Sequence, residues 1–269
     1  MCRLFFSFHT KNINNYIQLF LRQMDTTPIG SNNQDKGSNL YDGHPNDGYG
    51  FAVLDKNKKW ILYKTSTSVV LSPDKQIDNA IFSKKYSVIF GHLRYNSPLL
   101  KTPNQVEDNH PFLFRNQVFL HNGHIQDFHH HYKQHKQIVE SWIDPRLKQY
   151  IKGTTDSERI FFVYMTLLRN LSKTEDRKQV YMIKAVQLMM ELCKKSNIKF
   201  VGNFMYADAE YAVIYRSGPY PLYYDDETDA TNILVTRKNI TPMAKNRMIP
   251  KNSVILINFA DKKETLFRL

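Results

Sequence analysis

The chain has 269 residues, 42% of them hydrophobic and 13% aromatic, so it can bury a sizeable core and is not wholly disordered. No apolar run reaches the roughly 20 residues needed to span a membrane, and the start lacks the apolar stretch of a signal peptide. The net charge of +12 invites a nucleic-acid interpretation, but the lysines are scattered and no nucleic-acid-binding motif accompanies them. We therefore expect no specific nucleic-acid recognition.

The first hundred residues alternate strands and helices. Strands are predicted at Leu4–Phe8, Asp47–Leu54, Trp60–Thr65 and Ser87–Phe90, the last running into Gly91-His92-Leu93-Arg94. Apolar residues three and four apart predict one helix over residues 13–24, capped by Asn12, and a second starting at Ser72-Pro73-Asp74, with Pro73 in its first turn. Residues 25–46 are rich in Gly, Asn, Asp, Ser and Pro and are predicted to form a long loop.

The rest of the chain continues this alternation. A strand over Gln117–Leu120 is predicted to end at His121-Asn122-Gly123, and helices are predicted over Ile160–Leu171 and Arg177–Lys195. Thr155 and Glu158 have the spacing of a capping box at the start of the first of these helices. Closing strands are predicted at residues 200–206, 211–216, 222–224, 233–236 and 254–259. The pattern indicates two packed sheets with helices outside, in a single domain spanning residues 2–269.

Cys2 is the first candidate for chemistry. If Met1 is removed, which the small cysteine side chain permits, Cys2 carries a thiol and a free α-amine on one carbon. An α-amine has a pKa of about 7.7–8.0 and can accept and return a proton at neutral pH, and a thiolate is a strong nucleophile. The alternative is that Cys2 merely begins a buried strand. The other cysteine, Cys193, lies in an apolar helical pattern and is predicted to pack in the core. Two cysteines form no disulfide framework, so we expect the protein to work in a reducing, cytoplasmic compartment.

Asn122 and Gly123 are candidates for an oxyanion hole. A cysteine amidase needs hydrogen-bond donors for the tetrahedral oxyanion, each worth on the order of 10²–10³ in rate. An asparagine side chain and a backbone N–H without a neighbouring Cβ can supply them. The same dipeptide is also the commonest two-residue hairpin turn, and this alternative stays open.

Arg94 and Asp156 are candidates for binding an amino-acid-like substrate. Arg94, just past a strand, could hold an α-carboxylate through two parallel hydrogen bonds, although a solvated surface arginine is the simpler alternative. Asp156 lies where a helix begins and could hold an α-ammonium group, because Thr155 and Glu158 can do the capping. Its alternative is an ordinary acidic residue in a first helical turn.

Six short motifs occur in one order along residues 2–158. They are Cys2-Arg3, Asp47-Gly48-Tyr49-Gly50, Gly91-His92-Leu93-Arg94-Tyr95, Asn109-His110-Pro111-Phe112, His121-Asn122-Gly123 and Thr155-Asp156-Ser157-Glu158. In this order they resemble the class II glutamine amidotransferases, which are N-terminal-nucleophile hydrolases. More narrowly, the chain is similar to stand-alone γ-glutamyl amidohydrolases. The resemblance implies an α+β fold, a four-layer αββα sandwich of two antiparallel sheets.

The resemblance also implies roles for individual residues. Cys2 corresponds to the nucleophile, Arg94 to the arginine holding the α-carboxylate, and Asp156 to the aspartate holding the α-amino group. Asn122 and Gly123 correspond to the oxyanion hole, and His121 positions that strand end. The run Asn109–Phe112 is expected to shape the loop before the oxyanion strand.

One stretch departs from the family pattern. Many members have Ala-Thr-His after the arginine-aromatic pair, whereas this chain has Asn96-Ser97-Pro98. Ser97 keeps a hydroxyl where the threonine stands and is assigned to substrate binding, but Pro98 cannot replace the histidine. Pocket specificity therefore stays open.

The implied activity is hydrolysis of the γ-amide of glutamine or a γ-glutamyl compound, with no cofactor. An ammonia-accepting synthase subunit and a homo-oligomer both remain open, and no membrane partner is expected. The main alternative is a catalytically inactive scaffold or a polyanion-binding protein. A metal site among His121, His124, His129, His130, His131 and His135 is not expected, because their spacing lacks a metal-binding pattern.

Overall fold

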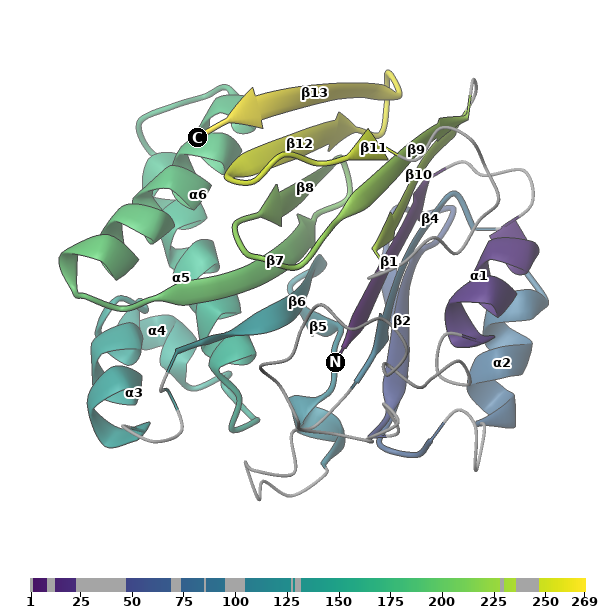
Figure 1. Cartoon of the computed structure of the whole chain (residues 1–269), viewed down its shortest axis with the longest axis horizontal. Coiled ribbons are helices and arrows are strands. Elements are labelled where there is room, and N and C mark those ends of the chain that lie inside the picture. The colour runs from purple at the N-terminus through teal and green to yellow at the C-terminus, as the bar shows by residue number, and fades with distance from the viewer. Residues whose placement is uncertain are drawn as a thin grey trace, which may run out of the picture.

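Two antiparallel sheets packed face to face form the centre of the protein in the computed structural model (Figure 1). The structure describes residues 2–8, 13–22, 47–68, 74–84, 86–94, 105–126, 128, 132–227, 230–235 and 247–269. The first sheet has the order β11-β9-β10-β1-β4-β2-β3 and the second the order β13-β12-β8-β7-β6-β5. The strands in the first half of the chain are β1 (Arg3–Phe8), β2 (Tyr49–Leu54), β3 (Trp60–Thr65), β4 (Val88–Leu93), β5 (Phe112–Phe114) and β6 (Gln117–Ile125). Those in the second half are β7 (Phe200–Ala207), β8 (Tyr211–Arg216), β9 (Tyr223–Glu227), β10 (Ala230–Val235), β11 (Arg247–Met248), β12 (Ser253–Asn258) and β13 (Lys263–Arg268).

Helices cover the outer face of each sheet (Figure 1). Helices α1 (Ile13–Arg22) and α2 (Lys75–Phe82) pack on the first sheet, in a core that contains Phe5, Phe20 and Phe51. Helices α3 (Tyr132–Ser141), α4 (Pro145–Lys148), α5 (Asp156–Leu171) and α6 (Lys178–Lys195) lie on the side of the second sheet. The four-layer αββα sandwich is therefore confirmed.

The alternation of side chains along each strand divides the core into three layers. In β1, Leu4, Phe6 and Phe8 enter the cluster between the sheets, whereas Phe5 enters the cluster under α1 and α2. Successive strand residues point to opposite faces, so a strand buried on both sides reads as a continuous apolar run. We call the two sheet surfaces that face one another the inner faces. Side chains that point to the inner faces can contact one another across the two sheets, and this determines which site residues lie close together.

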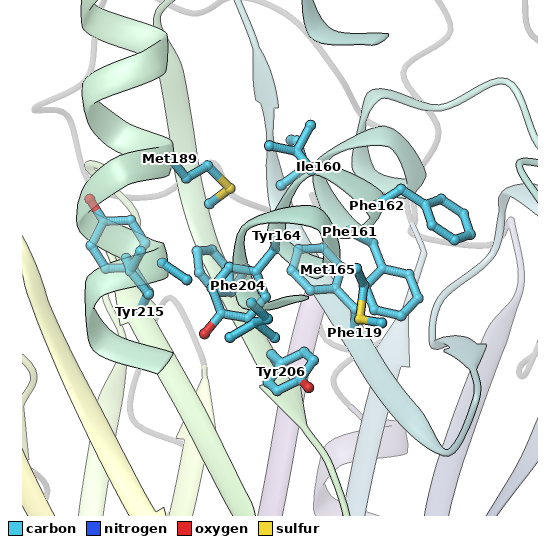
Figure 2. Packing of buried hydrophobic residues seen from close by; sticks show 14 of the residues in the cluster. Phe119, Ile160, Phe161, Phe162, Tyr164, Met165, Met189, Phe204, Tyr206 and Tyr215 are labelled. Atoms are coloured by element: carbon cyan, nitrogen blue, oxygen red, sulfur yellow. The ribbon is translucent and has the colours of Figure 1, made fainter. Parts of the chain in front are cut away.

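Aromatic rings fix α5 against the second sheet (Figure 2). The ring of Phe119 on β6 stacks on Phe161 of α5 and on Phe204 of β7, each at a centroid distance of 5.3 Å. Tyr164, one turn further along α5, packs edge-on against Tyr206 at 4.9 Å. This packing holds the start of α5 beside the second half of β6.

Helix starts differ in detail from the prediction. Helix α2 begins at Lys75, after the N-cap Asp74, whose carboxylate accepts hydrogen bonds from the backbone N–H groups of Gln76 and Ile77. The helix therefore begins two residues later than the prediction that starts it at Pro73, a residue that lies outside the described ranges. At α5 the Thr155 hydroxyl caps Glu158 as expected, but the Glu158 carboxylate accepts from the N–H groups of Lys152 and Gly153 instead of closing the box.

Several elements were not predicted. Strand β13 is a largely exposed edge without apolar alternation, and α3 is mostly polar, so neither carries the periodicity that marks a buried element. Strands β5 and β11 are two or three residues long, too short for a pattern. The predicted cap Asn12, Met24 and the loop over residues 25–46 lie outside the described residues.

The inner core predicts a large stability effect at Phe6. Its side chain is fully buried, and its ring lies 4.8 Å from that of Phe90, centroid to centroid. Phe6→Ala should lower the free energy of unfolding by about 3–5 kcal/mol through lost burial and the cavity left behind. Urea denaturation measures this. Leu266→Ala, at a position half exposed on β13, is the control and should cost less than about 1 kcal/mol.

Candidate active site

Cys2 and Asn122 meet where β1 and β6 approach one another from opposite sheets. The inward residues of β1 are Leu4, Phe6 and Phe8, and continuing the alternation places Cys2 on the same side. On β6, Val118 and Leu120 point inward, and the same alternation places Asn122 on that side. The Asn122 Nδ2 donates a hydrogen bond to the Cys2 backbone oxygen at 3.1 Å. The strand alternation thus brings the predicted nucleophile and the predicted oxyanion donor together.

Arg94 joins this group from the neighbouring strand. In the antiparallel pair of β1 and β4, Arg3 lies opposite Leu93, so Cys2 comes opposite Arg94 one step further along. The Arg94 backbone N–H donates to Gly48 at 2.9 Å, and its Nη1 donates to Asn109 Oδ1 at 2.6 Å. Arg94 is 6% exposed, so the alternative of a solvated surface arginine is wrong.

Asn109 is a residue that sequence analysis undervalued. Its carboxamide accepts from Arg94 and donates to the Thr65 backbone oxygen at 2.7 Å, which ties the guanidinium to the end of β3. The motif containing Asn109 was expected only to shape a loop. The only signal in the sequence was its place in the motif Asn109-His110-Pro111-Phe112, because its contact with Arg94, 15 residues away, arises from the tertiary structure.

Asn122 and Gly123 lie inside β6 and do not end it. Asn122 pairs with Asn203 and Gly123 with Gly202 on β7. Both the predicted strand end at Leu120 and the alternative of a hairpin turn are therefore wrong. Long-range pairing with β7 overrides the local turn signal of Asn-Gly.

The glycine at position 123 is required by its cross-strand neighbour. A Cβ on Gly123 would lie 2.0 Å from the Val201 backbone oxygen and 2.6 Å from the Gly202 Cα. Gly202 has a φ of +143°, which side chains rarely allow, and a Cβ there would lie 2.5 Å from the Asn122 backbone oxygen. Two glycines facing one another let β6 and β7 approach closely beside the Asn122 side chain.

Asp156 and His121 lie on the other side of β6. Phe119 and Ile125 enter the core under α5, and His121 follows the same alternation. The Asp156 carboxylate accepts from the Ile125 backbone N–H at 2.6 Å and from the Ser157 hydroxyl at 3.3 Å. His121 Nδ1 lies 3.0 Å from that hydroxyl. The Asp156 carboxylate therefore also holds the backbone of β6. Ser97, the remaining predicted site residue, lies outside the described residues.

No protein-family profile and no curated protein matches this sequence. Solved structures do match. The chain aligns over its whole length with 49% of a structure titled as the allosteric regulatory enzyme of purine biosynthesis, at a TM-score of 0.65 and 16% identity. It aligns with 49% of the glutamine phosphoribosylpyrophosphate amidotransferase of B. subtilis at a TM-score of 0.60 and 16% identity. A class II glutamine amidotransferase domain protein from Silicibacter pomeroyi matches over 82% of this chain and 91% of its own length, at a TM-score of 0.57 and 16% identity.

This chain has the class II glutamine amidotransferase fold.

Neutral histidines surround the site in this amidotransferase fold. Burial, followed by the charge of Arg94, lowers the pKa of His92 to about 3, and burial lowers that of His121 to about 4 against the opposing effect of Asp156. Burial and the neighbouring His92 also hold the pKa of His110 well below its usual value. The rings of His92 and His110 lie 4.3 Å apart, and none of their nitrogens has a hydrogen-bond partner among the described residues. These imidazoles are uncharged at neutral pH.

Other predictions concern metals, membranes and the second cysteine. Within the described ranges, no group of three or more His, Cys, Asp or Glu side chains could hold a metal ion. His124 lies on β6 and His135 on α3, whereas His129, His130 and His131 fall outside the described residues. No described helix combines the length and apolar character of a membrane span. Cys193 is buried in the core of α6, as predicted, and burial raises its thiol pKa to about 11.

The buried histidines predict acid sensitivity of the amidotransferase fold. In the unfolded chain a histidine binds a proton near pH 6.5, whereas folded His92 and His121 stay neutral until about pH 3 and pH 4. Their contribution is therefore complete above pH 6.5 and is lost as the pH falls toward the folded pKa. The free energy of unfolding should fall by about 1 kcal/mol per pH unit for each histidine between pH 6 and pH 4.5.

Urea denaturation across this pH range tests the sign and the assignment. His92→Gln should reduce the slope by one histidine's share. Equal slopes in the wild type and His92→Gln would contradict a neutral buried His92.

Proposed function

We propose that this protein hydrolyses the γ-amide bond of glutamine or of a γ-glutamyl compound, with Cys2 as the nucleophile. The observation that carries the proposal is the hydrogen bond from Asn122 to the Cys2 backbone oxygen. This bond supports the proposal because it joins the Asn122 carboxamide to the backbone of Cys2, which lies opposite Arg94 at the start of β1. The shared fold with class II glutamine amidotransferase domains supports the same activity.

The proposed reaction begins with removal of Met1. The freed α-amine of Cys2 takes the thiol proton, and the thiolate attacks the γ-carbonyl carbon. Asn122 Nδ2 carries two N–H donors, of which one holds the Cys2 backbone oxygen and the other can bind the oxyanion together with the Gly123 N–H. The C–N bond then breaks, the amine leaves with the proton from the α-ammonium, and a γ-glutamyl thioester remains. Water attacks the thioester and releases glutamate.

Substrate binding is proposed to use both ends of the glutamyl group. Arg94 would hold the α-carboxylate, with Asn109 fixing the orientation of the guanidinium. Asp156 is proposed for the α-ammonium and Ser97 for an additional hydroxyl contact. The Asp156 carboxylate also accepts the Ile125 N–H, so it would hold β6 in position as well. The Ser157 hydroxyl, which donates to Asp156 and lies beside His121 Nδ1, would link the carboxylate to a second residue of β6.

The proposed hydrolysis of glutamine releases ammonia, which either leaves into solvent or passes to a second protein. The protein acts either as a stand-alone γ-glutamyl amidohydrolase or as a glutaminase subunit that passes ammonia to a separate synthase. Stimulation of glutamate release by a candidate acceptor protein would favour the second form. A catalytically inactive scaffold would release glutamate under neither condition.

Loss of the Cys2 thiol should abolish the reaction. Cys2→Ala should release no glutamate from glutamine or γ-glutamyl substrates, because the proposed thioester forms on the Cys2 sulfur. Cys193→Ala is the matched control and should remain active, since Cys193 is buried in the α6 core. A coupled glutamate assay measures both. Intact-mass analysis should show loss of Met1 and labelling of Cys2 alone by a glutamine-like alkylating analogue; active protein that retains Met1 would contradict the α-amine mechanism.

Removal of the Asn122 carboxamide should lower kcat more than it changes KM. Asn122→Ala loses one oxyanion donor, so kcat should fall on the order of 10²–10³. Asn116→Ala is the control, because Asn116 precedes β6 at its far end and, among the described residues, its side chain bonds to the main chain at Trp60 and Lys58. Steady-state kinetics distinguish the two, and an Asn122→Ala enzyme with wild-type kcat would remove Asn122 from the mechanism.

A further inference from the structure

A row of buried polar side chains continues from Asn122 across the second sheet. Asn122 on β6 pairs with Asn203 on β7, Asn203 with Arg216 on β8, and Arg216 with Ser253 on β12. The inward neighbours two residues away on these strands, Leu120, Met205, Ile214 and Ile255, all belong to the cluster between the sheets. The four polar residues therefore share the inner face, and each is at most 5% exposed. We call them the polar row.

Only one of the two polar atoms of the Asn203 carboxamide has a hydrogen-bond partner in the part of the chain that the structure describes. Its Nδ2 donates to the Tyr220 backbone oxygen at 3.1 Å, whereas its Oδ1 is buried without a hydrogen-bond partner. A buried acceptor left unpaired costs free energy, so such atoms in native proteins call for an explanation. An acceptor beside Asn122 is suited to an N–H group of a bound molecule.

Arg216 presents the complementary feature, a buried cation. Its Nε donates to the Tyr220 backbone oxygen at 3.2 Å and its Nη1 to the Ile249 backbone oxygen. These carbonyl groups satisfy two of five N–H donors but supply no negative charge. No carboxylate whose position the structure describes lies within 4.0 Å, and burial lowers the Arg216 pKa. An unpaired buried charge is costly, and a bound anion would compensate it.

We propose that Asn203 and Arg216 form a subsite for the leaving group, and that this leaving group is an amino acid. This inference rests on the function proposed above. The Asn203 Oδ1 accepts the N–H of the scissile amide, and the Arg216 guanidinium binds the carboxylate of the departing amino acid. Glutamine, whose leaving group is ammonia, leaves the Arg216 half of the subsite empty. The preferred substrates are therefore γ-glutamyl amino acids.

The spacing of the strands suits this assignment. Neighbouring strands lie about 4.8 Å apart, so the Arg216 backbone is about 10 Å from that of Asn122. The arginine side chain and the short amino-acid leaving group together span such a gap.

In the reaction the C–N bond of the γ-amide breaks, the acyl group stays on Cys2, and the amino acid leaves with the proton held by the α-amine. Water then cleaves the thioester, so no further reactant is needed.

Two matched substrates test the subsite. γ-Glutamylglycine and γ-glutamylethylamide have the same amide and chain length, and differ only in a terminal carboxylate or methyl group. The wild-type enzyme should prefer γ-glutamylglycine by about 10- to 100-fold in kcat/KM, the range of one charge-assisted hydrogen-bonded contact. A wild-type ratio near one overturns the inference, and this comparison needs no variant.

Variants then assign the preference to Arg216. Arg216→Met should bring the ratio to about one while the ethylamide rate changes much less, and Arg216→Lys should keep part of the preference. Arg268→Met, at an exposed position on β13, is the control and should keep the full ratio. A purely structural Arg216, which only joins the segments of Tyr220 and Ile249, would lower both rates equally, and that result overturns the inference. If Arg216→Met does not fold by circular dichroism, Arg216→Lys and the wild-type ratio decide.

Binding separates this inference from the proposed function. Calorimetry with the Cys2→Ala protein compares γ-glutamylglycine with γ-glutamylethylamide without turnover. Tighter binding of γ-glutamylglycine, lost on adding Arg216→Met, supports the subsite even if the wild type releases no glutamate and the proposed hydrolysis fails. Equal binding of the two compounds overturns the subsite, whereas glutamate release with no preference overturns it and leaves the proposed hydrolysis intact.

Discussion

The hydrogen bond from Asn122 to the Cys2 backbone oxygen connects the two sheets at the candidate site. Cys2 precedes β1 in the first sheet, and Asn122 lies in the middle of β6 in the second. Their relation therefore depends on how the inner faces pack, which is decided by apolar residues such as Phe6, Phe90 and Leu120. A site at the end of a packed sandwich has rigid strands on both sides, which is what a preorganised oxyanion donor requires.

A second constraint acts within the sheet that carries Asn122. Gly123 and Gly202 face one another across β6 and β7, and Gly218 packs on Gly202, where an added Cβ would lie 2.8 Å from the Gly202 nitrogen. The Ser217 N–H and hydroxyl both donate to the Gly202 oxygen, at 3.1 and 2.8 Å. This close approach packs the backbones of β6, β7 and the segment of Ser217 and Gly218 against one another.

The charges around the site follow from burial. His92, His110 and His121 are neutral, and Arg94 is oriented by the uncharged carboxamide of Asn109. Arg216 lies in the same inner layer, held by two backbone oxygens. Two buried guanidinium groups on the inner faces suit a substrate with two carboxylates. A γ-glutamyl amino acid has one at each end, which links the proposed function to the proposed subsite.

The sequence by itself determined the elements whose periodicity is strong and the motifs that carry chemistry. Alternating and continuous apolar runs located β1, β2, β3 and β8, and the order of motifs pointed to the four-layer sandwich and to Cys2, Arg94 and Asn122. Local signals failed where long-range pairing decides. Asn-Gly favours a turn in isolation, but the partner glycine at 202 turns it into the middle of a strand. Only the tertiary structure placed Asp156 and His121 on the outer side of β6, and only it aligned Asn203 and Arg216 with Asn122. Asn203 and Arg216 lie about 80 and 95 positions after Asn122 in the chain. The register between β6 and β7, which are far apart in the sequence and joined by no tight turn, sets them beside Asn122.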